Sequence, residues 1–513
     1  MADALPSSTI PDIIPTYTHQ QIKRVVTGIM LCILLAALDQ TVVIPAVPAI
    51  AADLGAFGHL SWIVTAYLLT STAATPIYGK LSDIYGRRAL LLPALMLFIA
   101  ASMACGFAQT LPQLIGARAL QGLGGAGLLS MAQAAVADVV SPRERGRYQG
   151  YMASMWGVAS VAGPLVGGYV TDHLSWRWVF WANLPVGLAA MWLCDRALRT
   201  IPVQRRDARI DGVGAALLAG GVTALLLMLS WGGAEFPWAS APVVGTGALG
   251  CVLLAALVWQ ERRVADPILP PHLFGNPTFL RGVLIAFFAS LGLFGATFLL
   301  PLYFQLVLGM AAAGSGLMVI PFLVASVVGA FGSGQYARRI GRTKAIVLTA
   351  LLACIVGFAG LAVLTGNATL WLVLPCTALL GLGIGATMPS VLMQVQNAAA
   401  RQDVGAATGS LLFLRSMGGA FGSTIVGALL VARFNAGLHA AGFAGNIDLG
   451  ALRGGAEGMA DVGSLGLART ALVGGFQLSF AVCAVLLCVA VVIAAGMRDL
   501  QLRSTDVPQE VGH

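Results

Sequence analysis

Long runs of apolar residues, separated by short polar segments, follow one another along almost the whole chain. A helix needs about 20 such residues to cross the hydrocarbon core of a bilayer, and fourteen runs come close to or exceed that length. The runs cover residues 25–47, 61–78, 89–108, 111–139, 148–170, 178–194, 212–231, 241–259, 283–306, 314–336, 345–364, 370–395, 405–431 and 471–495. The pattern therefore predicts an all-α integral membrane protein with fourteen transmembrane helices.

The composition points in the same direction. Only 10% of the residues are charged, against about 25% in a typical soluble protein, whereas 58% are hydrophobic and the mean hydropathy is +0.86. A water-soluble fold would lack the polar surface to cover so much apolar side chain. The 63 glycines have no collagen-like period and suit transmembrane helices that pack closely. These values exclude an ordinary soluble protein and a disordered chain.

The basic residues indicate how the predicted helices are oriented. If the amino terminus is cytoplasmic, 23 of the 29 Lys and Arg residues fall in inner segments and four in outer loops, while Arg118 and Arg415 lie inside predicted helices. This is the positive-inside rule of membrane proteins, so the pI of about 9.3 reports topology and not a nucleic-acid partner. We therefore expect a multi-pass protein of the plasma (cytoplasmic or inner) membrane with both termini cytoplasmic.

No cleaved signal, disulfide framework or metal site is predicted. The first 22 residues are polar, and the apolar run after them is long, contains Asp39 and lacks a small-residue cleavage site, unlike a signal peptide. All eight cysteines lie in or beside apolar runs, which argues against paired or metal-binding cysteines.

Three sequence features recur in the same order about 255 residues apart. The turn 79–88 (GKLSDIYGRR) corresponds to 334–344 (GQYARRIGRTK), segment 122–127 to 381–386, and segment 163–168 to 418–422. Two six-helix halves joined by a two-helix insert are the simplest arrangement that explains this repeat. The predicted regions are a cytoplasmic tail (1–24), the N-terminal half (25–194), a linker with two extra transmembrane helices (195–281), the C-terminal half (282–495) with a long outer loop (433–470), and a second cytoplasmic tail (496–513).

These motifs resemble those of the major facilitator superfamily, and within it the fourteen-helix branch of drug:proton antiporters. The resemblance spans nearly the whole chain. It rests on the turn 79–88, the first-helix segment 38–48 (LDQTVVIPAVP), the fourth-helix segment 118–124 (RALQGLG), the fifth-helix segment with Gly157 and 163–168 (GPLVGG), and the sixth-helix segment 176–187 (WRWVFWANLPVG). Two departures are present: Ile44 and Pro45 replace the usual Asn-Val, and Arg338 stands in the second half where Asp83 stands in the first. The resemblance implies a major facilitator fold with helices arranged as 6+2+6.

Asp39 is the main candidate for proton coupling, because it is the only acid that the pattern places well inside a predicted span. A carboxylate in a membrane is costly enough that function is the default hypothesis, and it can exchange a proton or attract a cationic drug. Arg118 stays protonated and is expected to modulate this acid. The alternatives are structural: Arg118, or Gln40 and Thr41, satisfies Asp39, and Arg118 ties helices together through carbonyls. Arg415 matches no family motif and is expected to be structural.

Charged residues at predicted cytoplasmic helix ends form a candidate gate, where they can pair with each other and with helix dipoles. The resemblance implies that this cluster closes the cytoplasmic side in the outward-facing state and breaks as the transporter turns inward. The alternative is a positive-inside loop with a tight glycine turn. The gate candidates are Gly79, Asp83, Gly86, Arg87, Arg88 and Asp138.

The fifth predicted helix and several large side chains complete the candidates. Gly163 and Gly167 let helices approach closely, and Pro164 leaves a carbonyl free to kink the helix; with Gly157 and Gly168 they form the candidate hinge, for which simple packing is the alternative. Aromatic and Met side chains offer adaptable apolar and cation–π surfaces to a substrate. The cavity candidates, most of which we expect to serve packing, are Trp62, Tyr67, Met155, Trp156, Tyr303, Gln305, Phe413 and Met417.

The leading hypothesis is a proton-coupled antiporter that exports hydrophobic, neutral or monocationic, drugs by alternating access, without a bound cofactor. The alternatives are a dedicated exporter of an endogenous lipid, siderophore or metabolite, and an uptake symporter. The chain lacks a GxxxxGK[ST] phosphate loop, which argues against an ATP-driven pump, and it lacks nucleophile and metal-pair motifs, which argues against an enzyme. The expected partners are the lipophilic substrate, protons and the bilayer, with the monomer as the functional unit. The loop 433–470 is expected to be a mobile connector or part of an exit path.

Overall fold

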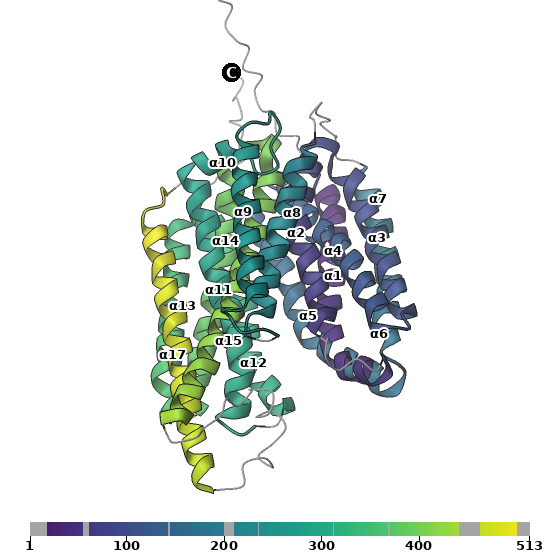
Figure 1. The fold of residues 1–513 in the computed structure, drawn as a ribbon. Helices are drawn as coiled ribbons and strands as arrows, with labels where there is room; N and C mark the ends of the chain where they lie inside the picture. Colours follow the sequence, from purple (N-terminus) through teal and green to yellow (C-terminus); the bar gives the residue numbers. More distant parts are fainter. Residues whose placement is uncertain are drawn as a thin grey trace, which may run out of the picture.

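The computed structural model describes residues 18–54, 61–141, 144–199, 210–233, 235–310, 312–367, 370–440 and 462–499, and these are almost entirely helical (Figure 1). The first group of helices is α1 (His19–Leu54), α2 (Ser61–Tyr85), α3 (Arg87–Phe107), α4 (Leu111–Val139), α5 (Arg145–His173), α6 (Arg177–Trp181) and α7 (Asn183–Leu198). The insert contributes α8 (Gly212–Trp231) and α9 (Ala241–Glu261), followed by the short α10 (Pro271–Gly275). The last group is α11 (Pro277–Leu306), α12 (Ala312–Ile340), α13 (Lys344–Leu364), η2 (Thr365–Asn367), α14 (Leu370–Ala398), η3 (Arg401–Asp403), α15 (Val404–Ala440) and α17 (Val462–Ala495). The predicted all-α fold class is confirmed.

The predicted apolar runs lie within helix, apart from Ala108 just past the end of α3, but the sixth run, 178–194, is divided between α6 and α7. Pro185 has no N–H to donate to the carbonyl of Trp181, so the helix is interrupted and α7 begins anew at Asn183. Ten of the described helices are long and apolar enough to cross a membrane. The count of fourteen crossings stays a prediction, because α2, α4, α5 and the divided pair α6 and α7 are not among those ten.

The helices of the two halves pack in the same pattern. In the first half α1 contacts α4, α5 and α7; in the second, α11 makes the corresponding contacts with α14, α15 and α17. Likewise α4 packs against α2 and α3, and α14 packs against α12 and α13. The repeat seen in the sequence is therefore also a repeat of helix packing.

Two helix pairs make the main contacts between the halves: α2 lies against α15, and α5 lies against α12. Figure 1 shows the ribbons of the halves close together at the end near α10 and farther apart toward α6. Lys80, Arg87 and Arg145 lie at the first of these ends, which we call the basic end. The topology prediction assigns this end to the cytoplasm.

The insert helix α8 lies against both α2 and α15, so it touches both halves. An apolar cluster, here called the insert cluster, fills this region. Its buried members are Leu69, Ala73, Leu218, Val222, Leu226, Leu229, Leu257, Ile268, Phe413 and Met417.

Parts of all five predicted regions lie outside the described residues. Most of both tails and residues 200–209 of the linker are among them. Of the predicted outer loop 433–470, the two ends are helical, since α15 continues to Ala440 and α17 begins at Val462. Residues 441–461 lie outside the described part of the chain.

Candidate transport site and gates

Asp39 and Arg118 form an ion pair inside the N-terminal half. Asp39 lies on α1 and Arg118 on α4, and the Nη1 to Oδ2 distance is 2.8 Å. The two side chains are almost inaccessible, with exposures of 0% for Asp39 and 1% for Arg118. Such a pair is costly to break from one side only, because the remaining charge is left buried without a partner.

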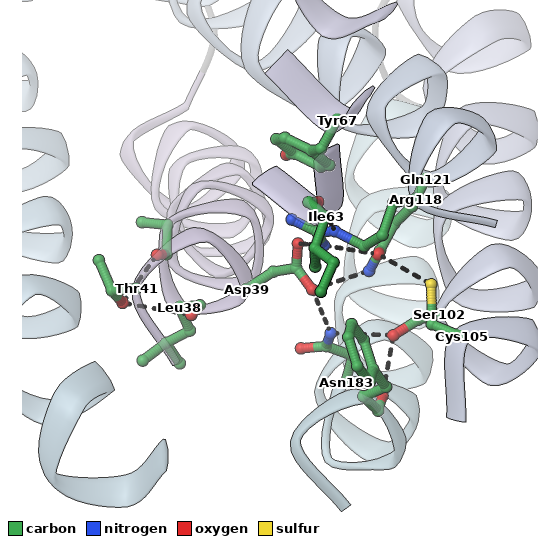
Figure 2. A network of polar contacts seen from close by, with 12 residues as sticks. Leu38, Asp39, Thr41, Ile63, Tyr67, Ser102, Cys105, Arg118, Gln121 and Asn183 are labelled. Atoms are coloured by element: carbon green, nitrogen blue, oxygen red, sulfur yellow. Dashed lines mark hydrogen bonds and ion pairs between the residues drawn. The ribbon is translucent and has the colours of Figure 1, made fainter. Parts of the chain in front are cut away.

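Further polar groups complete the surroundings of Asp39 (Figure 2). The other carboxylate oxygen, Oδ1, accepts hydrogen bonds from Gln121 Nε2 at 2.8 Å and Asn183 Nδ2 at 2.9 Å. Arg118 donates from Nη1 to Gln121 Oε1 at 2.8 Å and from Nε to the carbonyl of Ile63 at 3.1 Å. Both carboxylate oxygens of Asp39 are therefore engaged.

Asn183, the first residue of α7, extends this network to α3. Asn183 Nδ2 also donates to Ser102 Oγ at 3.0 Å, and Ser102 Oγ donates to the carbonyl of Phe180 at 2.8 Å. The network thus links α1, α3, α4 and the start of α7. Asn183 and Gln121 lie within the sixth- and fourth-helix motifs, but no feature of the sequence assigns them to Asp39, because their contacts depend on how α4 and α7 pack against α1.

The alternative partners considered for Asp39 behave differently. The single hydroxyl proton of Thr41 has three carbonyl acceptors within reach, those of Ala37 and Leu38 in its own helix and that of Ala159 on α5, 2.9 Å from Oγ1. Tyr67, a cavity candidate, is buried with its ring 4.5 Å from the guanidinium carbon of Arg118, a geometry that favours a cation–π contact. Tyr67 therefore lies beside the ion pair.

The gate candidates meet at the basic end of the bundle. Arg87 lies between Asp83, with Nη1 2.8 Å from Oδ1, and Asp138, with Nε 2.8 Å from Oδ2. Asp83 also accepts hydrogen bonds from the main-chain N–H groups of Gly405 at 2.9 Å and Ala406 at 2.7 Å. These are orphan donors at the start of α15, where a carboxylate is favoured by the helix dipole. An acid of the first half therefore caps a helix of the second.

Two glycines of the gate have definite steric roles. A Cβ on Gly79 would lie 2.5 Å from the carbonyl oxygen of Gly405, so only glycine lets α2 and α15 approach this closely. Gly86 has φ of +88°, a conformation that other residues rarely adopt. It forms the turn between α2 and α3.

Arg88 belongs to a different contact from the rest of the gate. Its Nη2 lies 2.6 Å from Oδ1 of Asp195 at the end of α7, and Arg199 lies 2.6 Å from Oδ2. Hydrogen bonds from Arg88 and then Arg199 lower the pKa of Asp195. A carboxyl group whose pKa is lowered on folding stabilises the fold at pH values above its unfolded-state pKa, and this stabilisation is lost as the pH falls through its folded-state pKa. The link therefore persists at neutral pH.

The second half makes a related contact at the same end. A Cβ on Gly146 would lie 2.5 Å from the carbonyl oxygen of Gly334, so α5 and α12 also meet at glycine. Arg338 Nε lies 2.6 Å from Glu144 Oε1, immediately before α5. Gly341 has φ of +70°, as Gly86 does in the first half. The repeated turn motif is enough to identify Gly334 and Gly341 from the sequence. No feature of the sequence indicates that Glu144 takes part in this contact.

The hinge candidates fall into two groups. Gly163 and Gly167 face α1, where a Cβ would collide with Thr41 Oγ1 and the carbonyl of Val42, respectively. Gly157 faces α12, where a Cβ would lie 2.5 Å from Val327 Cγ2. By contrast, Gly168 has open space around it and Pro164 is exposed. Close helix packing therefore explains three of the five residues.

Several cavity candidates lie in apolar packing. Phe413 and Met417 belong to the insert cluster, and Trp62 packs against it with its ring 6.4 Å from that of Trp231. Tyr303 is buried in the C-terminal core, 5.7 Å from the ring of Phe476.

The remaining cavity candidates are partly buried. Met155 and Trp156 pack against the N-terminal core, and Gln305 Nε2 donates to Ser315 Oγ at 2.9 Å. Within the described ranges, no group of three or more His, Cys, Asp or Glu side chains could hold a metal ion.

Comparisons with known proteins agree with this architecture. A family model described as Major Facilitator Superfamily matches residues 29–423. The multidrug transporter protein MdtP of Bacillus subtilis (strain 168) is 37% identical over 416 residues, covering 81% of this chain and 76% of that protein. Multidrug resistance protein 3 of the same organism is 34% identical over 415 residues, 79% of either chain.

Among solved structures, the proton:xylose symporter XylE is similar with a TM-score of 0.64 at 14% identity, over 94% of this chain and 97% of that one, which shows a shared fold. The family match covers most of the chain, and its multiple apolar helices are those of a multi-pass membrane protein. The chain therefore belongs to the Major Facilitator Superfamily and is a membrane transporter, not an enzyme.

Proposed function

We propose that this protein is a proton-driven antiporter that exports hydrophobic small molecules. The observation that carries the proposal is the buried Asp39–Arg118 pair, because an intramembrane acid is rare and costly and marks a proton or ion path. The names of the curated relatives, a multidrug transporter and a multidrug resistance protein, support export as the direction.

Proton exchange at Asp39 provides the coupling step. When a proton binds Asp39 from the outside, the carboxylate loses its charge and Arg118 loses its ionic partner. Gln121 and Asn183 donate to the same carboxylate, so their hydrogen bonds weaken together with the ion pair. Loss of the proton to the cytoplasm restores the network and resets the cycle.

The gate at the basic end provides the alternation. We assign this end to the cytoplasm, with both termini on that side of the plasma membrane and the monomer as the working unit. The contacts of Asp83 with α15 and the glycine contacts between α5 and α12 close that end in the present conformation, which corresponds to an outward-facing state. Opening requires that these contacts separate while the halves close elsewhere.

The test is proton movement in proteoliposomes that contain the purified protein and an acidic lumen. Adding transported compounds should release protons from the parent protein. Asp39→Asn should lose this release by about a hundredfold or more, since it removes the proton site and leaves Arg118 buried without its counter-charge.

The matched control is Asp53→Asn. Asp53 is an acid on the same helix that also pairs with an arginine, Arg177, at 2.8 Å, but its side chain is 46% exposed. This variant should behave like the parent. Proton release that persists in Asp39→Asn would place the coupling site elsewhere.

A further inference from the structure

Arg415 is a charged side chain within an apolar helix, and the described part of the structure gives it no bonding partner. It lies on α15 and its side chain is partly buried. In the part of the chain that the structure describes, it makes no hydrogen bond, ion pair or ring contact. Asp39 and Arg118, the other charges that lie deep in the apolar spans, neutralise each other, so one positive charge is left over.

Other buried arginines in this protein look different, because they have bonding partners. Arg145 donates from Nη2 to the carbonyl of Ala137 at 2.6 Å and from Nε to that of Val140 at 3.1 Å. Arg118 bonds to a carbonyl as well as to Asp39. The structural role expected for Arg415 from sequence therefore has no contact that carries it.

Helix geometry shows which way Arg415 faces. Successive residues of an α-helix are about 100° apart, so Arg415 lies on the opposite side of α15 from Phe413 and Met417. Those two residues pack in the insert cluster against α8. Arg415 therefore points away from the insert.

Its own side of α15 faces the boundary between the two halves. Thr408, two turns earlier, lies on the same face and accepts a hydrogen bond from Gln396 Nε2 of α14 at 3.1 Å. The same Nε2 donates to the carbonyl of Gln133 on α4, in the other half, at 3.5 Å. Four residues after Arg415, a Cβ on Gly419 would contact the ring of Phe294, which is 40% exposed. This side of α15 is thus bordered by α11 and α14 of its own half and, through Gln396, adjoins α4 of the other half.

We propose that Arg415 recognises the substrate, and that the preferred substrates are amphiphiles with one anionic group, such as a carboxylate or sulfonate. The guanidinium fork matches the two oxygens of such a group. A low-dielectric surrounding strengthens both its attraction for an anion and its repulsion of a cation. In this conformation the Asp39 side chain is inaccessible and its charge is already paired with Arg118, so it is not presented to a cationic drug. The inference rests on the proposed export function, whose substrate it specifies.

Binding to the purified protein tests this proposal separately from transport. Three probes share one apolar body and differ only in the head group: 4-(1-pyrenyl)butyrate, pyrenebutanol and pyrenebutyl-trimethylammonium. Energy transfer from tryptophan to pyrene reports binding. We expect the parent to bind the carboxylate at least tenfold more tightly than the ammonium probe.

Two variants locate the preference. Arg415→Gln should bind all three probes with similar affinity, and Arg415→Lys should retain most of the preference, since it keeps the charge. A parent that prefers the ammonium or neutral probe would overturn the proposal even if Arg415→Gln does not fold. So would an unchanged carboxylate preference in a folded Arg415→Gln protein.

The results for proton antiport and for the anionic substrate class can be separated. A carboxylate preference that depends on Arg415, together with no substrate-driven proton release from the proteoliposomes, would retain the binding site and reject proton antiport. Proton release that depends on Asp39, together with no carboxylate preference, would retain antiport and reject the anionic substrate class.

Discussion

Arg338 of the second half pairs with Glu144 of the first half, with Nε 2.6 Å from Oε1. Arg338 occupies the position that Asp83 occupies in the first repeat, and both residues reach across to the start of a helix in the opposite half. Asp83 meets main-chain N–H groups there and needs to be acidic, whereas Arg338 meets a carboxylate and needs to be basic. The departure between the repeats is therefore a change of charge that suits a different partner.

This pair predicts a charge-reversal effect. Glu144→Gln should change stability by less than about 1 kcal/mol, because both side chains are substantially exposed, 43% for Arg338 and 37% for Glu144. Glu144→Arg places two cations together and should reduce transport several-fold. Combining it with Arg338→Glu should restore the rate, as measured by initial rates in proteoliposomes. No recovery in the double variant would mean that the pair does not contribute to closing the gate.

Asp83 is expected to control the opening of the basic end. In Asp83→Asn the N–H groups of Gly405 and Ala406 lose a charged acceptor, a bond worth about 1.5–3 kcal/mol. Their amide hydrogens should exchange roughly tenfold to a hundredfold faster, which hydrogen exchange with mass spectrometry can measure on peptides covering the start of α15. Transport should fall in parallel, because the outward-facing state is less populated.

Asp138→Asn is the matched control for that experiment. It removes a second carboxylate from Arg87 at the same 2.8 Å distance but leaves the contacts between Asp83 and α15 in place. Exchange at the start of α15 should then change much less. Equal acceleration in both variants would assign the protection to the charge cluster as a whole and not to the helix cap.

The glycine contact between α5 and α12 predicts a steric effect. Gly146→Ala puts a methyl group 2.5 Å from the carbonyl of Gly334, so the helices must separate at the basic end. We expect transport to fall severalfold or more and the basic end to become more accessible to a thiol reagent at an introduced cysteine. Gly168→Ala, on the same helix with open space around it, should remain active. A fully active Gly146→Ala protein would show that this close approach is dispensable.

Sequence reasoning located the elements of the site better than their contacts. Asp39 and Arg118 were recognised because a charge within an apolar run is conspicuous, and Arg118 was named as one partner of Asp39. Asn183 was not, since it is uncharged and only the packing of α7 against α1 brings it to the acid. Uncharged polar residues such as Gln121 occur in many helices, so only the packing of α4 against α1 reveals which of them reach the acid.

The cavity candidates show a second limit of sequence reasoning. They were chosen by residue type, and an aromatic or Met side chain has the same apolar character whether it faces a cavity, a core or another helix. The positions of α8 and α9 around the six-helix halves do not follow from hydropathy. As a result, Phe413 and Met417 lie against α8, and Arg415, between them in sequence, faces the other way.

The insert cluster leads to a prediction that separates packing from substrate recognition. Phe413 is 8% exposed and packs with Leu218 and Val222 of α8, so Phe413→Ala leaves a cavity where the insert meets the two halves. Core truncations of this kind cost about 3–5 kcal/mol. The thermal unfolding midpoint should therefore fall, while the KM for transported compounds stays within about twofold of the parent value. The opposite result, a raised KM at an unchanged midpoint, would mean that Phe413 contacts substrate in another conformation and that α8 forms part of the transport path.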